Sequence, residues 1–363
     1  MQNRWSTHTC KHNIQNSWND KTKEAYLYEK LEDHKVRCLL CPHKCVIQND
    51  SVGICKVRKN IEGTLYAQTY QKAAHMAVEK IEAEGVFHYE PGADILSLGT
   101  IGCNLNCSYC QNWSLSQAEY VAPNLISKCT SEKIIERALE NNIRILSWTY
   151  NEPAVWFEFV IDTARMAKKH GIVSLFKSAY FLSDEAIKMI IDVADVFAIS
   201  LKAMTNNYYK SHTGGWIEPV LNCVKRIYQS GKPFEIENLI VTGLTDNDDE
   251  YLKLIDYVKN QLDVNVPLHF SSFHPDYKYT HVEEAKLSDL SRARELAIDS
   301  GIKHVYVGNV FQNDGLHTYC SKCGTKLIER YGLSSNVLDT LGVNGKCNVC
   351  GEDNGIIMTN REK

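Results

Sequence analysis

Two adjoining stretches decide how this chain folds: DILSLG at residues 94–99 and GCNLNCSYC at residues 102–110. The first is a short apolar run of the kind that forms a buried strand. The second places Cys103, Cys107 and Cys110 close together, and the next cysteine along the chain is Cys129. A structural zinc site is closed by four ligands, whereas three thiolates suit an iron–sulfur cubane with one iron left open. An open iron lets a substrate or cofactor bind the metal directly.

Alternating strands and helices extend outward from these stretches over residues 94–308. Strands are predicted at 94–99, 144–149, 172–176, 196–201, 234–241 and 267–271, with a short one at 304–307. Helices are predicted at 130–142, 153–170, 183–193, 218–230, 248–262 and 287–300. Six βα units in strict alternation indicate a parallel sheet, either open and doubly wound or closed into a full or partial barrel. In both architectures the active site lies at the carboxyl ends of the strands.

Eleven of the fourteen cysteines fall into three groups, and the central three form one of them. The last group forms two C-x2-C pairs, each followed by a glycine, which predicts a zinc ribbon; its members are Cys320, Cys323, Cys347 and Cys350. The first group consists of Cys38, Cys41, Cys45 and Cys55. Its spacing fits either a zinc site or a second iron–sulfur cluster, with a slight preference for a structural metal site. Cys10, Cys129 and Cys223 stand alone and are interpreted as ordinary residues.

The chain is expected to divide into an α/β core and two appendages. An N-terminal cysteine-containing extension over residues 1–93 is expected to be polar and irregular, the core occupies residues 94–315, and a zinc-ribbon-like module occupies residues 316–363. Bound metal is expected to pin both appendages, because such short segments rarely bury enough surface to fold unaided.

Composition limits the classes of partner. The chain has 363 residues, 44% of them hydrophobic, and a formal net charge of −4, which argues against a nucleic-acid partner. The polar N-terminus lacks the apolar region of a secretory signal, and no run of about 18 apolar residues predicts a membrane span. A cytoplasmic protein is therefore expected, in which grouped cysteines act as metal ligands rather than as disulfides.

The stretch GCNLNCSYC, with an aromatic residue before its last cysteine and a strand before its first, resembles the cluster motif of the radical S-adenosylmethionine (SAM) superfamily. The resemblance implies that SAM chelates the open iron of a [4Fe–4S] cluster. An electron from the cluster then cleaves SAM to methionine and a 5′-deoxyadenosyl radical, which abstracts hydrogen from a substrate. The resemblance also implies a partial (βα)6 barrel of the TIM type and a reductant such as flavodoxin or ferredoxin.

Further stretches resemble one subfamily, the AmmeMemoRadiSam-system radical SAM enzymes, which are similar to pyruvate formate-lyase-activating enzymes. They include CLLCPHKC at residues 38–45, TYNEP at 149–153 and LHFSSFHPDYK at 268–278. This resemblance does not identify the substrate, which could be a small molecule, a peptide or a protein. It also leaves two kinds of enzyme open, a glycyl-radical activase and a maturase. An alternative of a different class is a zinc-binding scaffold or nucleic-acid-binding protein.

The resemblance also carries over to two cofactor contacts near the cysteines and the second strand. Tyr109 is expected near the adenine of SAM, although it is also an ordinary packing aromatic. Asn151 and Glu152 replace a Gly-Gly-Glu-type segment that holds the SAM amino group, because an ammonium group requires such acceptors. The same two residues also suit the start of a helix.

Two further contacts are expected at later strands. Lys202 matches the lysine of an Asp-Leu-Lys motif that faces the SAM carboxylate. Ser200 departs from the aspartate of that motif, which puts the ribose contact in doubt. His269 matches a histidine near SAM in the activating enzymes, although a lone histidine in an apolar strand is also typical of a core.

Overall fold

The computed structural model describes residues 21, 23–121 and 123–359. Its main sheet has eight strands in the order β15-β14-β13-β12-β11-β10-β8-β7, and all except β7 pair in parallel. The parallel strands are β8 (Asp94–Gly99), β10 (Ile145–Trp148), β11 (Val173–Ser178), β12 (Val196–Ser200), β13 (Phe234–Ile240), β14 (Leu268–Ser272) and β15 (Val305–Gly308). The predicted mixed α/β fold with a parallel sheet is therefore confirmed.

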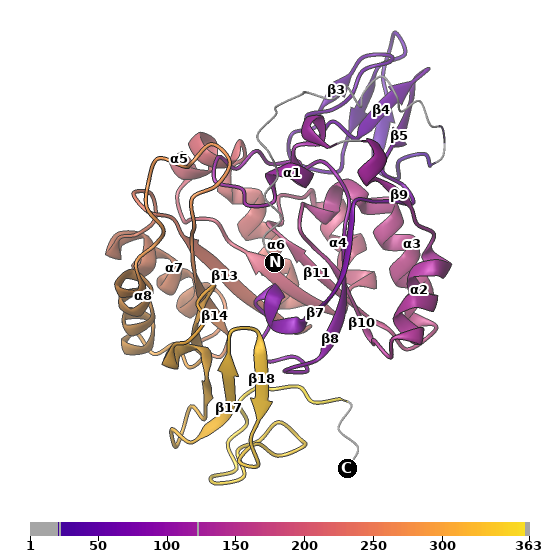
Figure 1. Ribbon diagram of the computed structural model, residues 1–363. Helices are drawn as coiled ribbons and strands as arrows, with labels where there is room; N and C mark the ends of the chain where they lie inside the picture. The colour runs from indigo at the N-terminus through magenta and orange to yellow at the C-terminus, as the bar shows by residue number, and fades with distance from the viewer. Residues whose placement is uncertain (1–20, 22, 122, 360–363) are drawn as a thin grey trace.

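Six long helices connect these strands in the predicted alternation. They are α2 (Ser131–Glu140), α3 (Phe157–Lys168), α4 (Asp184–Val193), α6 (Ile217–Gln229), α7 (Asp248–Gln261) and α8 (Leu287–Asp299). Their starts follow from capping chemistry, since the side chains of Thr130, Ser183 and Asn247 each accept the backbone N–H three residues later. In Figure 1, α2 and α3 lie on one flank of the sheet and α7 and α8 on the other.

Short helices fill the connections. They are η2 (Ile81–Glu84), α1 (Trp113–Ser116), η3 (Ala118–Tyr120), η4 (Pro123–Leu125), η5 (Pro153–Trp156), α5 (Asn206–Tyr208), η6 (Tyr209–Thr213) and η7 (Asp314–Leu316). In the part of the chain that the structure describes, no helix combines the length and apolar character needed to cross a bilayer.

The N-terminal segment is more regular than expected. It forms a three-stranded antiparallel sheet of β1 (Tyr28–Lys30), β2 (Val36–Cys38) and β3 (Val46–Ile47), and a hairpin of β4 (Arg58–Ile61) and β5 (Thr64–Ala67). β6 (Lys72–Ala73) pairs with β9 (Ser127–Lys128), and β7 (His75–Lys80) pairs along its whole length with β8. The expectation of an irregular segment was wrong, because β1 to β6 have only two to four residues each and are too short to show an alternating pattern.

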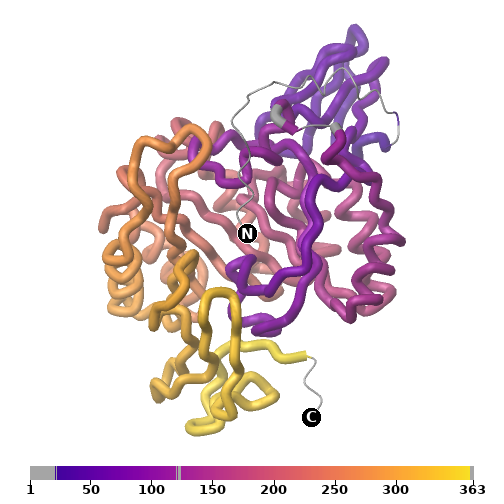
Figure 2. The backbone as a smooth tube through the Cα atoms, viewed as in Figure 1, coloured from indigo at the N-terminus to yellow at the C-terminus, as the bar shows by residue number. Residues whose placement is uncertain are grey.

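The C-terminal segment lies at the opposite end of the molecule from the N-terminal strands (Figure 2). It contains β16 (Thr318–Tyr319), β17 (Lys326–Tyr331) and β18 (Ser334–Val337). The buried guanidinium of Arg330 donates to the backbone oxygens of Phe87 and Leu316 at 2.9 and 3.0 Å. It also lies 4.1 Å from the centre of the Phe87 ring. Arg330 therefore fastens the C-terminal hairpin to the core, together with the hydrogen bond from the Ser335 hydroxyl to Glu82.

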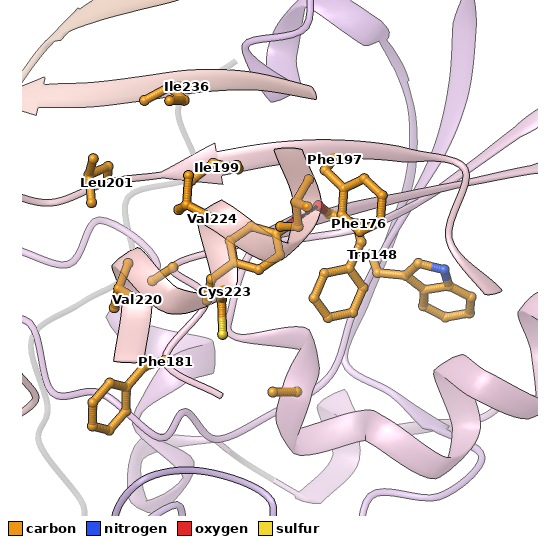
Figure 3. Close-up of a cluster of buried hydrophobic side chains, with 14 of the residues drawn as sticks. Trp148, Phe176, Phe181, Phe197, Ile199, Leu201, Val220, Cys223, Val224 and Ile236 are labelled. Atoms are coloured by element: carbon orange, nitrogen blue, oxygen red, sulfur yellow. Dashed lines mark hydrogen bonds between the residues drawn. The ribbon is translucent and has the colours of Figure 1, made fainter. Parts of the chain in front are cut away.

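The hydrophobic core lies between the sheet and its helices. Figure 3 shows aromatic side chains from neighbouring strands, among them Trp148, Phe176 and Phe197, packed beside Cys223 of α6. Phe176 and Phe197 are direct partners in the register of β11 and β12. Cys129 and Cys223 are both buried, which agrees with an ordinary structural role, whereas Cys10 lies outside the described residues. Truncation of such a buried aromatic typically costs about 3–5 kcal/mol.

Candidate active site at the carboxyl ends of the strands

A cavity of about 340 Å³ opens at the carboxyl ends of β8, β10, β11, β12 and β13. Its lining includes eight of the nine residues predicted for the central cluster and for SAM: Cys103, Cys107, Tyr109, Cys110, Asn151, Glu152, Ser200 and Lys202. Parallel strands end at the same edge of a sheet, so side chains that are far apart in sequence meet there. The structure thus brings these predicted residues to one site.

The cysteine loop is held by its backbone. The amide of Leu105 donates to Sγ of Cys103 at 3.3 Å, and the amides of Asn106 and Ser108 donate to carbonyl oxygens of η6. Gly102 has a φ of +85°, and a Cβ placed on it would lie 2.7 Å from the carbonyl oxygen of Cys55. Only glycine fits this position, because it tolerates the left-handed backbone and leaves room for the neighbouring chain.

The three cysteines fit the cluster that the sequence predicts. Burial raises the pKa of the Cys103 and Cys110 thiols and raises that of Cys107 to about 12, while the charge of Lys202 acts in the opposite direction on Cys107 and Cys110. Thiols in such a dry site become thiolates when they bind a metal. Among the described residues that line the cavity there is no fourth cysteine and no histidine. The donor set therefore suits a cluster with one open iron.

Glu152 presents a firmly held carboxylate beside these cysteines. Its Oε1 accepts a hydrogen bond from the Ser178 hydroxyl at 2.6 Å, and its Oε2 accepts one from the Ala179 amide at 3.0 Å. Burial raises the pKa of Glu152, and these hydrogen bonds and the charge of Lys202 oppose that rise. A carboxylate fixed in this way is suited to bind a cation without reorganisation.

Asn151 has a different role from Glu152, because its side-chain amide is already hydrogen-bonded to two backbone groups. Its Oδ1 accepts from the amide of Thr100 at 3.2 Å, and its Nδ2 donates to the carbonyl of Gly102 at 2.6 Å. The side chain therefore ties the turn after β10 to the residues that precede Cys103. The ring of Tyr109 packs 6.1 Å from that of Tyr208 and is buried.

His269 does not line this cavity. It is buried within β14, where its Nε2 lies 2.7 Å from Oε2 of Glu235 and its ring contacts Phe87 and Tyr306. The sequence resemblance placed this histidine near SAM, and the structure places it in the core below. A charged partner on the neighbouring strand explains how an imidazole is accommodated in an apolar strand.

Several polar residues at the base of the cavity were missed from the sequence. Lys177 of β11 donates to Glu237 of β13 at 2.9 Å, and Glu84 of η2 accepts hydrogen bonds from Ser147 and Thr149. Burial alone would raise the pKa of Glu237, but Lys177 and the Ser271 hydroxyl hold it down at about 2. The available signal was the pair of glutamates in the apolar stretch FEIENLIV at residues 234–241.

The C-terminal cysteines form a compact group. Their four sulfurs all lie within 4.8 Å of one another, with 3.5 Å between Cys320 and Cys350 and 3.7 Å between Cys323 and Cys347. Gly324 and Gly351 have φ values of +71° and +77°, as the tight turns of a zinc ribbon require. The group can therefore hold a single metal ion. The N-terminal cysteines line a second, smaller cavity near residues 102–104.

Comparison with known proteins agrees with this geometry. Residues 98–258, which include the cysteine loop and the strand ends around the cavity, match the radical SAM superfamily. The chain belongs to this superfamily and is an enzyme whose class uses an iron–sulfur cluster to cleave SAM. It is 39% identical over 338 residues to the uncharacterized protein MJ0808 of Methanocaldococcus jannaschii, an alignment that covers 93% of this chain and 100% of that protein.

More distant similarities cover smaller parts of the chain. The pyruvate formate-lyase-activating enzyme of Streptococcus mutans is 25% identical over 172 residues, which cover 44% of this chain and 63% of that enzyme. The crystal structure of Streptococcus suis SuiB bound to S-adenosylmethionine aligns at 14% identity with a TM-score of 0.48, covering 66% of this chain and 56% of that one.

Proposed function

We propose that this enzyme binds a [4Fe–4S] cluster through Cys103, Cys107 and Cys110 and reductively cleaves SAM to form a 5′-deoxyadenosyl radical. The radical would abstract hydrogen from a substrate that enters the same cavity. The observation that carries the proposal is the convergence of three half-buried cysteines, a fixed carboxylate and a lysine on one cavity, with no fourth cysteine and no histidine among its described lining residues. The cluster would supply the electron and the open coordination site.

The chain's own residues would bind and orient SAM. Glu152 would accept the ammonium group of its methionine part, because its carboxylate is held in place by Ser178 and Ala179. Lys202 would pair with the carboxylate, and Ser200 and Tyr109 would line the nucleoside side. Asn151 would act on the cysteine loop rather than on SAM, since its amide already bridges two backbone groups.

The polar base of the cavity would receive the substrate. Lys177, Glu237 and Glu84 offer a cation and two carboxylates there, a lining suited to a polar molecule or to part of a peptide. The substrate is accordingly proposed to be a polar small molecule, a peptide or a protein, as in a maturase or a glycyl-radical activase. A low-potential donor such as flavodoxin or ferredoxin would supply the electrons.

Two structural proposals accompany this function. The parallel strands would form a partial (βα)6 barrel of the TIM type, with the reaction at its carboxyl end. The C-terminal cysteines would hold Zn²⁺, because their sulfur separations match the roughly 3.8 Å expected around a tetrahedral zinc with Zn–S bonds of about 2.3 Å.

Anaerobic reconstitution tests the function. The reconstituted protein should be brown, absorb near 400 nm as iron–sulfur proteins do, and release 5′-deoxyadenosine from SAM when dithionite is added. A Cys103→Ala, Cys107→Ala, Cys110→Ala variant should release none. Cys129→Ala is the matched control, since it removes a buried cysteine outside the site. A colourless protein that contains only zinc would favour a zinc-binding scaffold and would overturn the proposal.

Two further variants test the assignment of residues. Glu152→Gln and Lys202→Met should keep their iron but bind SAM at least about tenfold more weakly, because each removes a charge pair worth about 1.4 kcal/mol or more. Isothermal titration with SAM measures this change. Unchanged affinity in both variants would contradict the assigned roles.

A further inference from the structure

We propose that Cys38, Cys41, Cys45 and Cys55 hold a second iron–sulfur cluster rather than zinc. All four cysteines line one small cavity together with Arg58 and Asn104. Cys38 ends β2, Cys41 and Cys45 lie in the turn between β2 and β3, and Cys55 lies in the turn before β4, which the fold brings to the same cavity.

The separation of the sulfurs distinguishes the two kinds of metal centre. Four thiolates on one zinc ion lie about 3.8 Å apart. In a cubane each thiolate binds a different iron, so the ligand sulfurs lie roughly 6 Å apart. Among the described residues, the C-terminal group alone has three or more candidate ligand atoms that all lie within 4.8 Å of one another. The N-terminal sulfurs are therefore more widely spaced than a zinc site requires.

The central cysteines provide an internal comparison. Cys103, Cys107 and Cys110 belong to the matched superfamily region, and they too lack the compact spacing of the C-terminal group. The chain thus contains both kinds of arrangement, open and compact. The N-terminal cysteines share the open kind with the site at which an iron–sulfur cluster is expected.

Backbone amides approach the N-terminal sulfurs in the manner of metal-bound thiolates. Burial raises the pKa of the Cys38, Cys41 and Cys55 thiols, and the backbone amides of Leu40, His43 and Val57 act in the opposite direction. The amide of Leu105 approaches Cys103 with the same spacing at 3.3 Å. Hydrogen bonds to the sulfurs stabilise the negative charge of a cluster.

A buried cation adds a separate indication. Arg58 lines the cavity with a side-chain exposure of 1%, and its Nη2 pairs with Glu158 at 2.6 Å. Its Nε and Nη1 are buried and have no hydrogen-bond partner among the described groups. Unpaired guanidinium nitrogens are costly to bury, so an anionic occupant beside them resolves the cost. A metal centre with four thiolates, whether zinc or a cluster, is such an anion, so Arg58 indicates an occupied site and the sulfur spacing selects the cluster.

The position of this site suggests its use, which rests on the proposed function. The carbonyl of Cys55 contacts Gly102, and the imidazole of His43 lies 2.9 Å from the carbonyl of Asn104, so the two cysteine sites adjoin on both sides of Cys103. Ile54, next to Cys55, is 54% exposed. One electron from a low-potential donor protein would enter on this exposed side, and the same electron would then pass to the central site.

Metal and sulfide analysis of the reconstituted wild-type protein tests the inference without any substitution. We expect about eight irons, about eight acid-labile sulfides and about one zinc per chain, since each cubane carries four irons. About four irons with two zincs, or about four irons with the N-terminal cysteines empty, would overturn the inference.

Variants assign the metal to each site. The N-terminal double variant Cys41→Ala, Cys45→Ala should lose about four irons and keep the other four, and so should the central triple variant. Cys129→Ala should lose none. If the central site held no iron, only the N-terminal variant would lose iron, so failure of the proposed function is distinguishable. Electron paramagnetic resonance of the reduced protein adds a readout that does not depend on activity. Wild type should show two interacting clusters, and each variant should show one isolated cluster.

Discussion

Gly102 lies directly against the backbone of Cys55, so closely that a Cβ added to Gly102 would come within 2.7 Å of the Cys55 carbonyl oxygen. The residue that precedes the first central cysteine therefore packs on the last N-terminal cysteine. The two cysteine segments are separated by about fifty positions in the sequence, yet they form one packed unit in the structure. A substitution that displaces one of these segments should therefore also displace the other.

Gly102→Ala tests this contact. The substitution should displace the cysteine loop and reduce bound iron, because the new methyl group meets backbone that cannot rotate away. Gly171→Ala is the matched control, since Gly171 also has a positive φ, +67°, but has nothing within 4 Å. Gly171→Ala should lower the free energy of unfolding by about 1 kcal/mol, because of backbone strain, and should keep its iron. Equal iron content in the two variants would show that the close contact is unimportant.

The half-buried pair of Lys177 and Glu237 should couple strongly. Lys177→Met leaves a carboxylate uncompensated at the base of the cavity and should lower the free energy of unfolding by about 3 kcal/mol. The double variant Lys177→Met, Glu237→Met should recover much of this loss. The exposed pair of Arg226 and Asp184 provides the comparison, and Asp184→Asn should cost under about 1 kcal/mol. Denaturant unfolding of wild type, Lys177→Met, Glu237→Met, the double variant and Asp184→Asn measures these effects, and additive effects at Lys177 and Glu237 would argue against the coupling.

Stability should fall as the pH is lowered from about 7 to 5 in a way that depends on His304. Burial and then the charge of Lys303 lower the pKa of His304 to about 4. The unfolded chain takes up a proton as the pH falls through about 6.5, and the folded chain does not, so folding is favoured above this range and weakened within it. Between pH 7 and 5, the free energy of unfolding of His304→Phe should therefore fall by about 1–2 kcal/mol less than that of wild type.

Unfolding at the two pH values, with both proteins carrying the same metals, measures this difference. His281→Gln, which changes an exposed histidine, is the control and should behave as wild type. An identical pH dependence in His304→Phe would contradict the explanation. His88, whose pKa burial also lowers, should maintain part of the dependence in the variant.

Removal of the C-terminal metal should leave the central site intact. The double variant Cys320→Ser, Cys323→Ser should lose one zinc per chain and keep all its iron, because α1, which follows the central cysteines, lies far from β17 and β18 of the C-terminal segment (Figure 1). Arg330 should still hold the hairpin through the carbonyls of Phe87 and Leu316. Metal analysis and protease sensitivity of residues 316–359 measure the outcome. Loss of iron together with zinc would show that the two ends are coupled.

Local patterns were sufficient to predict the framework. The six βα units follow from apolar runs, caps and glycine stops, and the cysteine loop follows from its spacing alone. β7 was missed because HMAVEK at residues 75–80 does not alternate between apolar and polar residues, and both faces of this strand are only partly buried. Its place in the sheet depends on pairing with β8, which is a tertiary contact.

The site was predictable only where one residue carries the chemistry. Cysteines in a motif can be recognised from the sequence, but the link between Lys177 and Glu237 joins β11 and β13 across β12, which spacing in sequence does not show. His269 shows the other limit, since the sequence left both a SAM contact and a core position open, and the structure places its imidazole against Glu235 in the core. Side-chain direction within a strand is set by the packing around it.

The placement of Glu84 has a practical consequence. This carboxylate comes from η2, ahead of the first parallel strand, and reaches under the cavity to the hydroxyls of Ser147 and Thr149. A truncated fragment that starts at residue 94 would therefore lack η2 and Glu84, and the base of the cavity would be exposed to water. Any minimal version of this enzyme has to start upstream of His75, so that β7 and η2 remain attached.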